Sequence, residues 1–384
     1  MLRESSDNET MRASLIFSTI IISLQSTVAI SAETFEFFNG IRQMGMGGAS
    51  IAVVNDETAL IANPAALGKL RDSFTTVFDP ELDYGKENSN VATGNTIFSA
   101  ANLQGMLDQL KLHPNKRFHL RSQLFPSYVT ANFGVGVFGK YTVDGEVDGT
   151  VTPNVFHLDV VQDLAFVIGY NFRIWDGRIK FGFNAKYINR TELKDQDPQV
   201  PLDTTGLRLA DFADEGGAMA ADIGLIITLP WAWLPTIAGV VRDAGGTKFT
   251  FAKGILHGGA ADANDPNYPT AQVPKPISQT IDAAFALFPI TAGRTRMTIT
   301  GEYTDVTNVN LELDSAKKIH AGFELNFSDL FFFRGGWNQR YWTAGLELAY
   351  ADMQFQMASY GEEIGTVDVN REDRRYSIKF AYRY

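Results

Sequence analysis

"YSIKFAYRY", residues 376–384, ends the chain and repeats with a strict period of two. Aromatic or aliphatic side chains occupy every second position, and these are Tyr376, Ile378, Phe380, Tyr382 and Tyr384. The side chains between them are small or basic. Alternation of this kind places an apolar face and a polar face on opposite sides of a β-strand. The stretch therefore predicts a strand that separates an apolar environment from a polar one.

The same period runs through the chain from residue 74 onward. In "RIKFGFNAKYINR", residues 178–190, Ile179 and Phe181 share one face while Lys180 and Asn184 share the other. We predict an all-β fold of about fourteen strands, near 74–80, 124–132, 133–143, 155–174, 178–191, 217–229, 236–249, 277–289, 294–304, 317–327, 329–337, 341–349, 352–360 and 374–384.

The connections between these strands differ in length from one end of the sheet to the other. Long connections cover 81–123, 144–154, 192–216, 250–276, 305–316 and 361–373, and they alternate with short turns such as 131–132, 175–177, 327–329 and 350–352. A strand of about 9–11 residues is long enough to cross a bilayer when tilted. Tight turns on one side and long loops on the other are typical of a transmembrane antiparallel β-barrel.

One stretch has the length of a membrane-spanning helix. "IGLIITLPWAWLPTIAGVV", residues 223–241, has no charged side chain. Pro230 and Pro235 bracket its two tryptophans, which suits a turn at the membrane interface better than a helix interior. We therefore predict a hairpin here.

The N-terminus resembles an export signal. "MRASLIFSTIIISLQSTVAISAE", residues 11–33, has Arg12, an apolar run from Leu15, and small residues before Glu33. These features predict a signal peptide over residues 1–32, cleaved after Ser31 or Ala32. A membrane anchor is the alternative, although several serines interrupt the run. Either Met1 or Met11 serves as the start.

Composition excludes several classes of protein. The chain of 384 residues has 33 basic and 44 acidic side chains and no cysteine. This balance argues against a nucleic-acid partner, and it excludes disulfides and thiolate metal sites. Scattered histidines (His113, His119, His157, His257 and His320) and the absence of a G-x-S-x-G elbow argue against an enzyme. "DANDPN", 262–267, lacks the ligand spacing of a calcium loop, so we expect no metal and no cofactor.

A compact apolar segment precedes the first strand. "GMGGASIAVVNDETALIANPAAL" covers residues 45–67. Its glycines permit close approach, Asp56 is placed to cap a short helix over 57–62, and a bend is expected at Asn63-Pro64. A barrel of about fourteen strands leaves a lumen to be filled. We therefore predict a hatch over residues 33–72 that plugs a barrel formed by residues 73–384.

This segment resembles the N-terminal hatch of the FadL family of outer-membrane transporters for long-chain fatty acids and other hydrophobic compounds. The resemblance rests on the glycine-rich start, the acidic residue and the Asn-Pro-Ala, which are Gly45, Gly47, Gly48, Asp56, Asn63, Pro64 and Ala65. It implies a plugged fourteen-stranded barrel, passive uptake of a hydrophobic ligand such as a fatty acid, and a hatch that acts as the gate. PorV-like barrels share the opening and serve protein secretion as a scaffold or shuttle, which is the alternative function.

The C-terminal strand resembles the signature by which outer-membrane barrels are recognised for assembly in Gram-negative bacteria. The matching residues are Ile378, Phe380, Tyr382 and Tyr384. The resemblance implies a multi-pass protein of the cell outer membrane. We expect it to be a monomer whose partners are the barrel assembly machinery and outer-membrane lipid.

Two further features suggest a ligand path. "ANLQGMLDQLK" places Leu103, Met106, Leu107 and Leu110 on one helical face, and Ile97 and Phe98 precede it. In the family, such outer helices form a groove for ligand entry; simple packing on the barrel rim is the alternative. Leu207, Leu209 and Phe212 in a later loop would complete either arrangement.

The glycines of "FGVGVFG", residues 133–139, predict a kinked or bulged strand. In FadL-type transporters a kinked strand opens a sideways exit from the lumen. Small residues that make room for the hatch are the alternative explanation.

Overall fold

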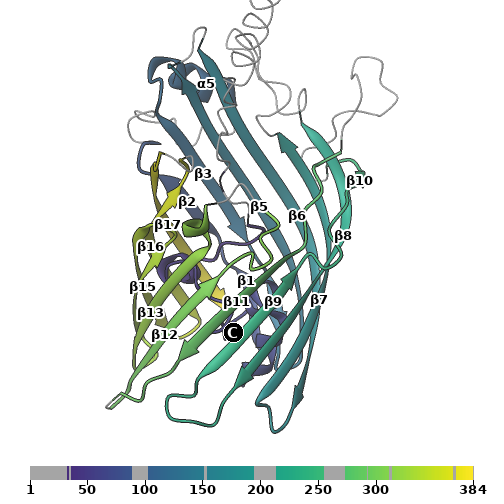
Figure 1. Cartoon of the computed structure of the whole chain (residues 1–384), viewed down its shortest axis with the longest axis vertical. Helices are drawn as coiled ribbons and strands as arrows, with labels where there is room; N and C mark the ends of the chain where they lie inside the picture. The colour runs from purple at the N-terminus through teal and green to yellow at the C-terminus, as the bar shows by residue number, and fades with distance from the viewer. Residues whose placement is uncertain are drawn as a thin grey trace, which may run out of the picture.

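The chain folds into an antiparallel β-barrel with a short helical segment inside it (Figure 1). This computed structural model describes residues 33, 36–88, 103–150, 154–193, 213–254, 273–291, 293–310, 314–365 and 369–383. The predicted signal peptide and Tyr384 lie outside the described residues.

The described strands form a single sheet. They are β1 (Phe74–Phe78), β2 (Glu81–Gly85), β3 (Arg117–Leu124), β4 (Ser127–Val129), β5 (Phe133–Asp148), β6 (Val155–Ile174), β7 (Ile179–Leu193), β8 (Asp214–Thr228), β9 (Thr236–Arg242), β10 (Thr250–Phe251), β11 (Thr280–Leu287), β12 (Thr295–Tyr303), β13 (Ile319–Phe327), β14 (Phe331–Asn338), β15 (Tyr341–Tyr350), β16 (Met353–Glu363) and β17 (Glu372–Arg383).

Fourteen of these strands close a ring in which each pairs with its neighbour and β17 pairs with β2. The remaining three are short continuations of ring strands. β1 leads into β2 across Asp79-Pro80, β4 follows β3 across Phe125-Pro126, and β10 follows β9. A proline has no N–H to donate to the ladder, so it interrupts a strand at this point. The prediction of about fourteen wall strands is confirmed.

Several predicted strand limits were wrong by five residues or more: β5 runs to Asp148 instead of 143 and β9 ends at Arg242 instead of 249, and two further errors lie around the first long loop. The first wall strand continues to Gly85, and the second begins at Arg117 instead of residue 124. The stretch "RFHLRSQL", residues 117–124, has its charged side chains on the lumen side of the wall. Because of these charged side chains, the sequence predicts a polar loop over this segment, although its alternation is regular.

The predicted hairpin over 223–241 is confirmed, because β8 and β9 pair across a turn at 229–235. Trp231 and Trp233 lie in this turn and are exposed. Among the described residues, no helix is both long and apolar enough to cross a membrane.

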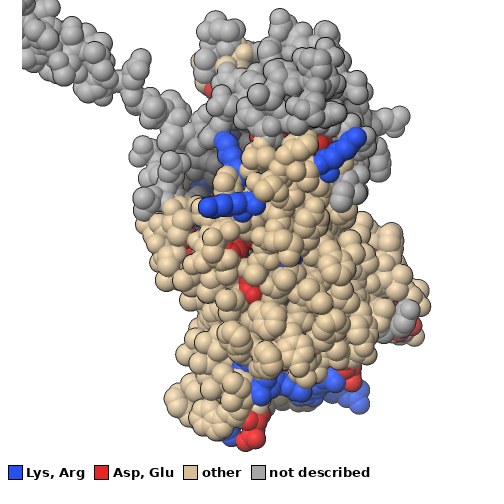
Figure 2. Space-filling view, turned by 90° about the vertical axis from the view of Figure 1, so that its right-hand side faces the viewer, with Lys and Arg blue, Asp and Glu red and all other residues tan. Residues whose placement is uncertain are grey.

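The side chains of the wall alternate between lipid and lumen as the C-terminal strand predicts. Ile378, Phe380 and Tyr382 point outward, while Arg375 and Lys379 are buried inside. In Figure 2 the lower part of the wall is largely free of charge, and blue and red side chains gather along its lower rim. An apolar belt of this kind is what a bilayer-spanning barrel presents to lipid.

The predicted hatch lies inside the barrel, where Figure 1 shows it in purple. It contains α2 (Ile41–Gly45), α3 (Ala59–Ala62) and the 3₁₀ helix η1 (Pro64–Lys69). The α2 helix contacts β14 to β17, whereas η1 contacts β6 to β8 on the opposite side of the ring. Its apolar side chains, such as Ile51, Leu60 and Leu67, are fully buried. The segment therefore spans the lumen; its limits as a separate domain stay a prediction.

Candidate functional site

The first contact between hatch and wall is built around Arg42 of α2. Its guanidinium donates two hydrogen bonds of 3.0 Å to the Glu324 carboxylate on β13 and one of 2.9 Å to Asp56 within the hatch. Burial by itself would raise the pKa of Asp56, but Arg42 and the Thr58 hydroxyl outweigh burial and hold that pKa below its ordinary value. These opposite charges compensate one another away from bulk solvent, as buried ions require.

Carboxylates of the wall and of the hatch make further links on the same side. Glu302 of β12 accepts hydrogen bonds from the backbone N–H groups of Ser50 (2.7 Å) and Ile51 (3.1 Å). Glu57 of the hatch pairs with Arg383 at 2.7 Å and with Lys379 at 3.5 Å. These links hold residues 50–57 against strands β12 and β17.

Asparagine side chains hold the opposite end of the hatch. Asn63 is fully buried; its side chain donates to Ile51 O at 2.8 Å and accepts from Ala65 N at 3.0 Å. From the wall, Asn184 donates to Leu60 O at 2.8 Å and Asn171 donates to Ala65 O at 3.0 Å. The bend predicted at Asn63-Pro64 is present, and Asn63 has extended backbone between α3 and η1.

The hatch also lies directly against glycines of the wall. A Cβ atom at Gly224 would lie 2.1 Å from Asn63 Oδ1, and one at Gly182 would lie 2.3 Å from the Pro64 backbone. A Cβ at Gly322, on the other side of the lumen, would lie 2.1 Å from Met46 O. These wall glycines were not predicted, although each occupies an inward position of an alternating strand.

The glycines predicted at the start of the hatch meet two separate demands. Gly47 and Gly48 have positive φ of 71° and 86°, a region that favours glycine. A Cβ at Gly47 would lie 2.2 Å from Ala321 O. Gly45 lies against Gly345, its hypothetical Cβ 3.2 Å from that Cα. The gating role of these residues and of Ala65 stays a prediction.

The predicted helix over 57–62 is shorter than expected. α3 begins at Ala59, and Asp56 does not cap it directly. Instead the Asp56 carboxylate accepts from the Thr58 N–H at 3.0 Å, which forms a turn before the helix. An aspartate often bonds to the backbone two residues later in this way, and this local turn displaces the helix start.

The hatch has two buried ionisable groups, Glu36 and Lys69, whose neighbours only partly offset the cost of burying a charge. Burial raises the pKa of Glu36 to about 7, since Asp282 adds to the effect and several cations only partly oppose it. Burial also lowers the pKa of Lys69 to about 7, with help from the charge of Lys180. Each group is therefore close to changing its charge near neutral pH.

Four phenylalanines form an aromatic cluster between the hatch and the wall. Phe37 and Phe38 of the hatch lie 5.0 and 5.8 Å from Phe138 of β5, and Phe125 lies 6.2 Å from the same ring. Phe125 and Phe138 are buried and face the lumen. Gly136 makes room for Phe125, since a Cβ there would lie 2.7 Å from its ring. This cluster is an apolar lining in a lumen rich in charge.

The wall is interrupted beside the aromatic cluster. The ladder between the first two wall strands stops at Thr76 and Ser127 and resumes at Glu81 and Gln123. The Asp79 carboxylate accepts from Phe125 N at 2.6 Å across the interruption. We name this interruption, residues 77–80 and 124–126, the seam.

The strand of residues 133–139 is regular, contrary to the predicted kink. β5 pairs with β6 without a shift of register from Phe133 to Asp148. Gly134 lies against Leu60 of the hatch, so room for the hatch explains this glycine. The ladder is interrupted instead at Pro80 and Pro126 of the two preceding strands, where proline has no N–H to donate.

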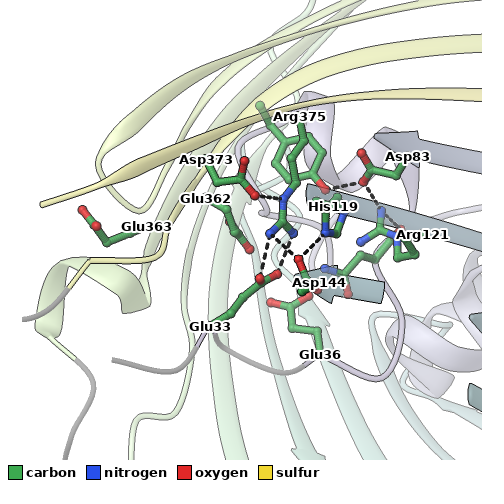
Figure 3. Close-up of polar contacts among 12 residues, drawn as sticks. Glu33, Glu36, Asp83, His119, Arg121, Asp144, Glu362, Glu363, Asp373 and Arg375 are labelled. Carbon is green, nitrogen blue, oxygen red and sulfur yellow. Dashed lines mark hydrogen bonds and ion pairs between the residues drawn. The ribbon is translucent and has the colours of Figure 1, made fainter. Parts of the chain in front are cut away.

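Ion pairs cross the lumen nearer the long loops (Figure 3). Arg375 holds the Glu33 carboxylate with hydrogen bonds of 2.6 and 2.7 Å, and Arg117 adds one of 3.0 Å. His119 contacts Asp144 at 2.8 Å. A cation site could be imagined among His119, Asp144 and Asp373. Because Arg117 and Arg375 pair with both carboxylates, little negative charge remains for a metal ion.

A cavity of about 20 Å³ lies between the hatch and the wall strands β16 and β17. Phe38, Met46 and Val54 form its apolar lining, and Arg42 and Lys379 form part of its polar lining. This volume holds about one water molecule. This cavity is far too small to hold a fatty acid.

The predicted outer helix is present as α5 (Leu103–Leu112) and packs on the outside of the wall. Met106, Leu107 and Leu110 are buried against outward side chains such as Val143 and Phe156. Ile97, Phe98, Leu207, Leu209 and Phe212, like the side chain of Leu103, lie outside the described residues. The entry groove stays a prediction, and three of its side chains are covered by the wall.

No protein-family model and no curated protein sequence matches the chain. Among solved structures, the Pseudomonas putida toluene transporter TodX superposes with a TM-score of 0.52 at 11% identity, covering 91% of this chain and 98% of that one. CymD, described as a monoaromatic hydrocarbon channel, gives 0.51 at 10% identity and covers 90% and 97%. The chain thus has the fold of these FadL-family transporters of hydrophobic compounds, a closed fourteen-stranded barrel.

Proposed function

We propose that this protein is an outer-membrane channel for the passive uptake of hydrophobic small molecules. The observation that carries the proposal is the aromatic cluster, which faces the lumen directly beside the seam. Burial of apolar ligand surface there is favourable, by about 0.8 kcal/mol for each methylene group. The fold shared with a toluene transporter and a monoaromatic hydrocarbon channel supports the same class of ligand.

The apolar belt and the C-terminal strand support a place in the outer membrane of a Gram-negative cell. The ligand would enter from the long loops, reach the aromatic cluster when the hatch shifts, and leave down its gradient. The seam offers a sideways exit, because among the described groups a single hydrogen bond, from Phe125 N to the Asp79 carboxylate, joins its two edges. No catalytic step is part of this proposal.

The class of ligand divides into two candidates. The resemblance of the hatch favours long-chain fatty acids, and the aromatic cluster together with the shared fold favours small aromatic compounds. The four phenylalanine rings can bind either class of ligand, since fatty acids and small aromatic compounds both bury apolar surface against such rings.

Ligand binding to purified protein tests the proposal. We expect Phe138→Ala to weaken binding of a fluorescent fatty acid or of toluene, because it removes the ring that contacts the other three. Phe166→Ala is the matched control, since Phe166 lies on β6 and points outward to lipid. Equal affinities of the Phe138 variant and the wild type for both probes would contradict the proposal.

A scaffold or shuttle in protein secretion is the second candidate. The polar, ion-paired lumen near the long loops favours it, because Arg117, Arg375 and Glu33 form no apolar path for a ligand. The scaffold predicts a loss of surface display or release of exported proteins in a strain without this protein. It also predicts that uptake of hydrophobic probes stays unchanged.

A further inference from the structure

The lumen side of the second wall strand carries a row of unsatisfied polar atoms. Five of its inward residues each have a buried side-chain atom without a hydrogen-bond partner among the described groups. They are Arg117 Nε, His119 Nε2, Arg121 Nε, Gln123 Oε1 and Ser127 Oγ. Most buried polar atoms in proteins are partnered, so a run of five along one strand calls for a common explanation.

The first wall strand faces this row with atoms of the same kind. Thr76 pairs directly with Ser127, Glu81 with Gln123, and Asp83 with Arg121. Thr76 Oγ1, Glu81 Oε1 and Asp83 Oδ1 are also buried without a hydrogen-bond partner in the described part of the chain, although Glu81 Oε1 lies 3.6 Å from Arg121 Nη2. Three cross-strand pairs therefore each contribute two unsatisfied atoms to the lumen.

The chemistry of these atoms points to water. The row mixes donors, such as Arg121 Nε, with acceptors, such as Gln123 Oε1 and Glu81 Oε1. A metal ion would need acceptors alone, and an anion would need donors alone. A water molecule donates and accepts, and a buried one typically makes about three hydrogen bonds to otherwise unsatisfied groups.

We propose that a file of ordered water runs along these two strands, beside the hatch, and lets the barrel pass water while the hatch is in place. From Arg117 to Ser127 the row extends about 33 Å at the rise of a β-strand. Phe125 is the inward residue between Gln123 and Ser127, and its buried ring separates the upper part of the file from the lower part. A hydrophobic constriction limits flow by excluding water, so Phe125 sets the rate.

Osmotic shrinkage of proteoliposomes, followed by stopped-flow light scattering, tests this inference. We expect wild-type vesicles to shrink faster than protein-free vesicles, and Phe125→Ala vesicles to shrink several-fold faster than wild type. Tyr128→Ala is the matched control, because Tyr128 lies on β4 outside the seam and points outward to lipid. Heat-modifiable migration on gels confirms that each variant forms a folded barrel.

A second pair of changes probes the polar row directly. Thr76→Val together with Ser127→Ala removes one complete pair and should slow shrinkage of the Phe125→Ala vesicles. Shrinkage of wild-type and Phe125→Ala vesicles at the rate of protein-free vesicles would overturn the inference. So would a polar-row variant that leaves the fast rate unchanged. The readout is water flow, so its failure is distinct from a failure of hydrophobic uptake.

Discussion

Single glycines set how closely the wall and the hatch approach each other. Gly182 and Gly224 on one side and Gly322 on the other leave no room for a Cβ atom. Alternation in the sequence predicts that such residues face inward. It does not predict what they face, because the contact joins segments more than one hundred residues apart in the chain. The close packing of the hatch against the wall could therefore not be predicted from the sequence. The role of the glycines within the hatch could be predicted.

Gly182→Val should displace the hatch while the barrel stays folded. Its new side chain would overlap the Pro64 backbone, which lies 2.3 Å from the Cβ position. Gly239→Val is the control, because the nearest atom to a Cβ there is 3.7 Å away. Limited proteolysis of the purified barrel should cut within residues 45–67 in the first variant and spare them in the second. Equal protection in both would show that the contact is not needed.

Lys69 should make stability depend on pH above neutrality. Its pKa is lowered to about 7 by burial, so between pH 7 and about 10 the unfolded chain binds a proton that the folded chain lacks. Stability therefore rises with pH in this window. We expect Lys69→Met to remove that rise in urea unfolding midpoints measured from pH 7 to 10. Lys248→Met, a change of an exposed lysine, should retain the rise.

At the scale of elements, alternation predicts strands better than it predicts where they end. The hairpin at 223–241 and the fourteen wall strands follow from period two, because the lumen and the lipid differ in polarity along the whole wall. The start of β3 does not, because the charged inward residues Arg117 and Arg121 belong to ion pairs that only the closed ring assembles. Predicting the seam would have required knowing that Pro80 and Pro126 fall in the same interruption of the ladder.

The C-terminal strand gives the prediction at this scale. Phe380→Lys or Tyr382→Lys should lower the amount of folded barrel in the outer membrane, since both side chains face lipid. A lysine on the lipid face costs on the order of 2–4 kcal/mol near the midplane and less toward the interface. Heat-modifiability of membrane fractions measures the folded amount. Ala381→Ser, an inward change on the same strand, is the control. Undiminished folded barrel in the lysine variants would remove the assembly signal from this account.

At the scale of the whole molecule, we expect the hatch to close a barrel that folds without it. Strand pairing around the ring satisfies the backbone groups of the wall, and the hatch adds side-chain contacts inside. Deletion of residues 45–67 should therefore leave a folded barrel that admits small polar solutes. Swelling of vesicles in a sugar such as arabinose measures this leak, and full-length protein should show little of it. A deletion variant that is folded but tight would mean that the wall, not the hatch, closes the lumen.

Uptake of hydrophobic probes by intact cells tests the central claim most directly. Cells with the wild-type protein, cells without it and cells with Phe138→Ala would be compared in the initial entry rate of a fluorescent long-chain fatty acid and of radiolabelled toluene. We expect fast entry of at least one probe with the wild type, slow entry without the protein, and intermediate entry with the variant. Equal rates in all three strains for both probes would contradict transport and leave the secretion scaffold as the better explanation.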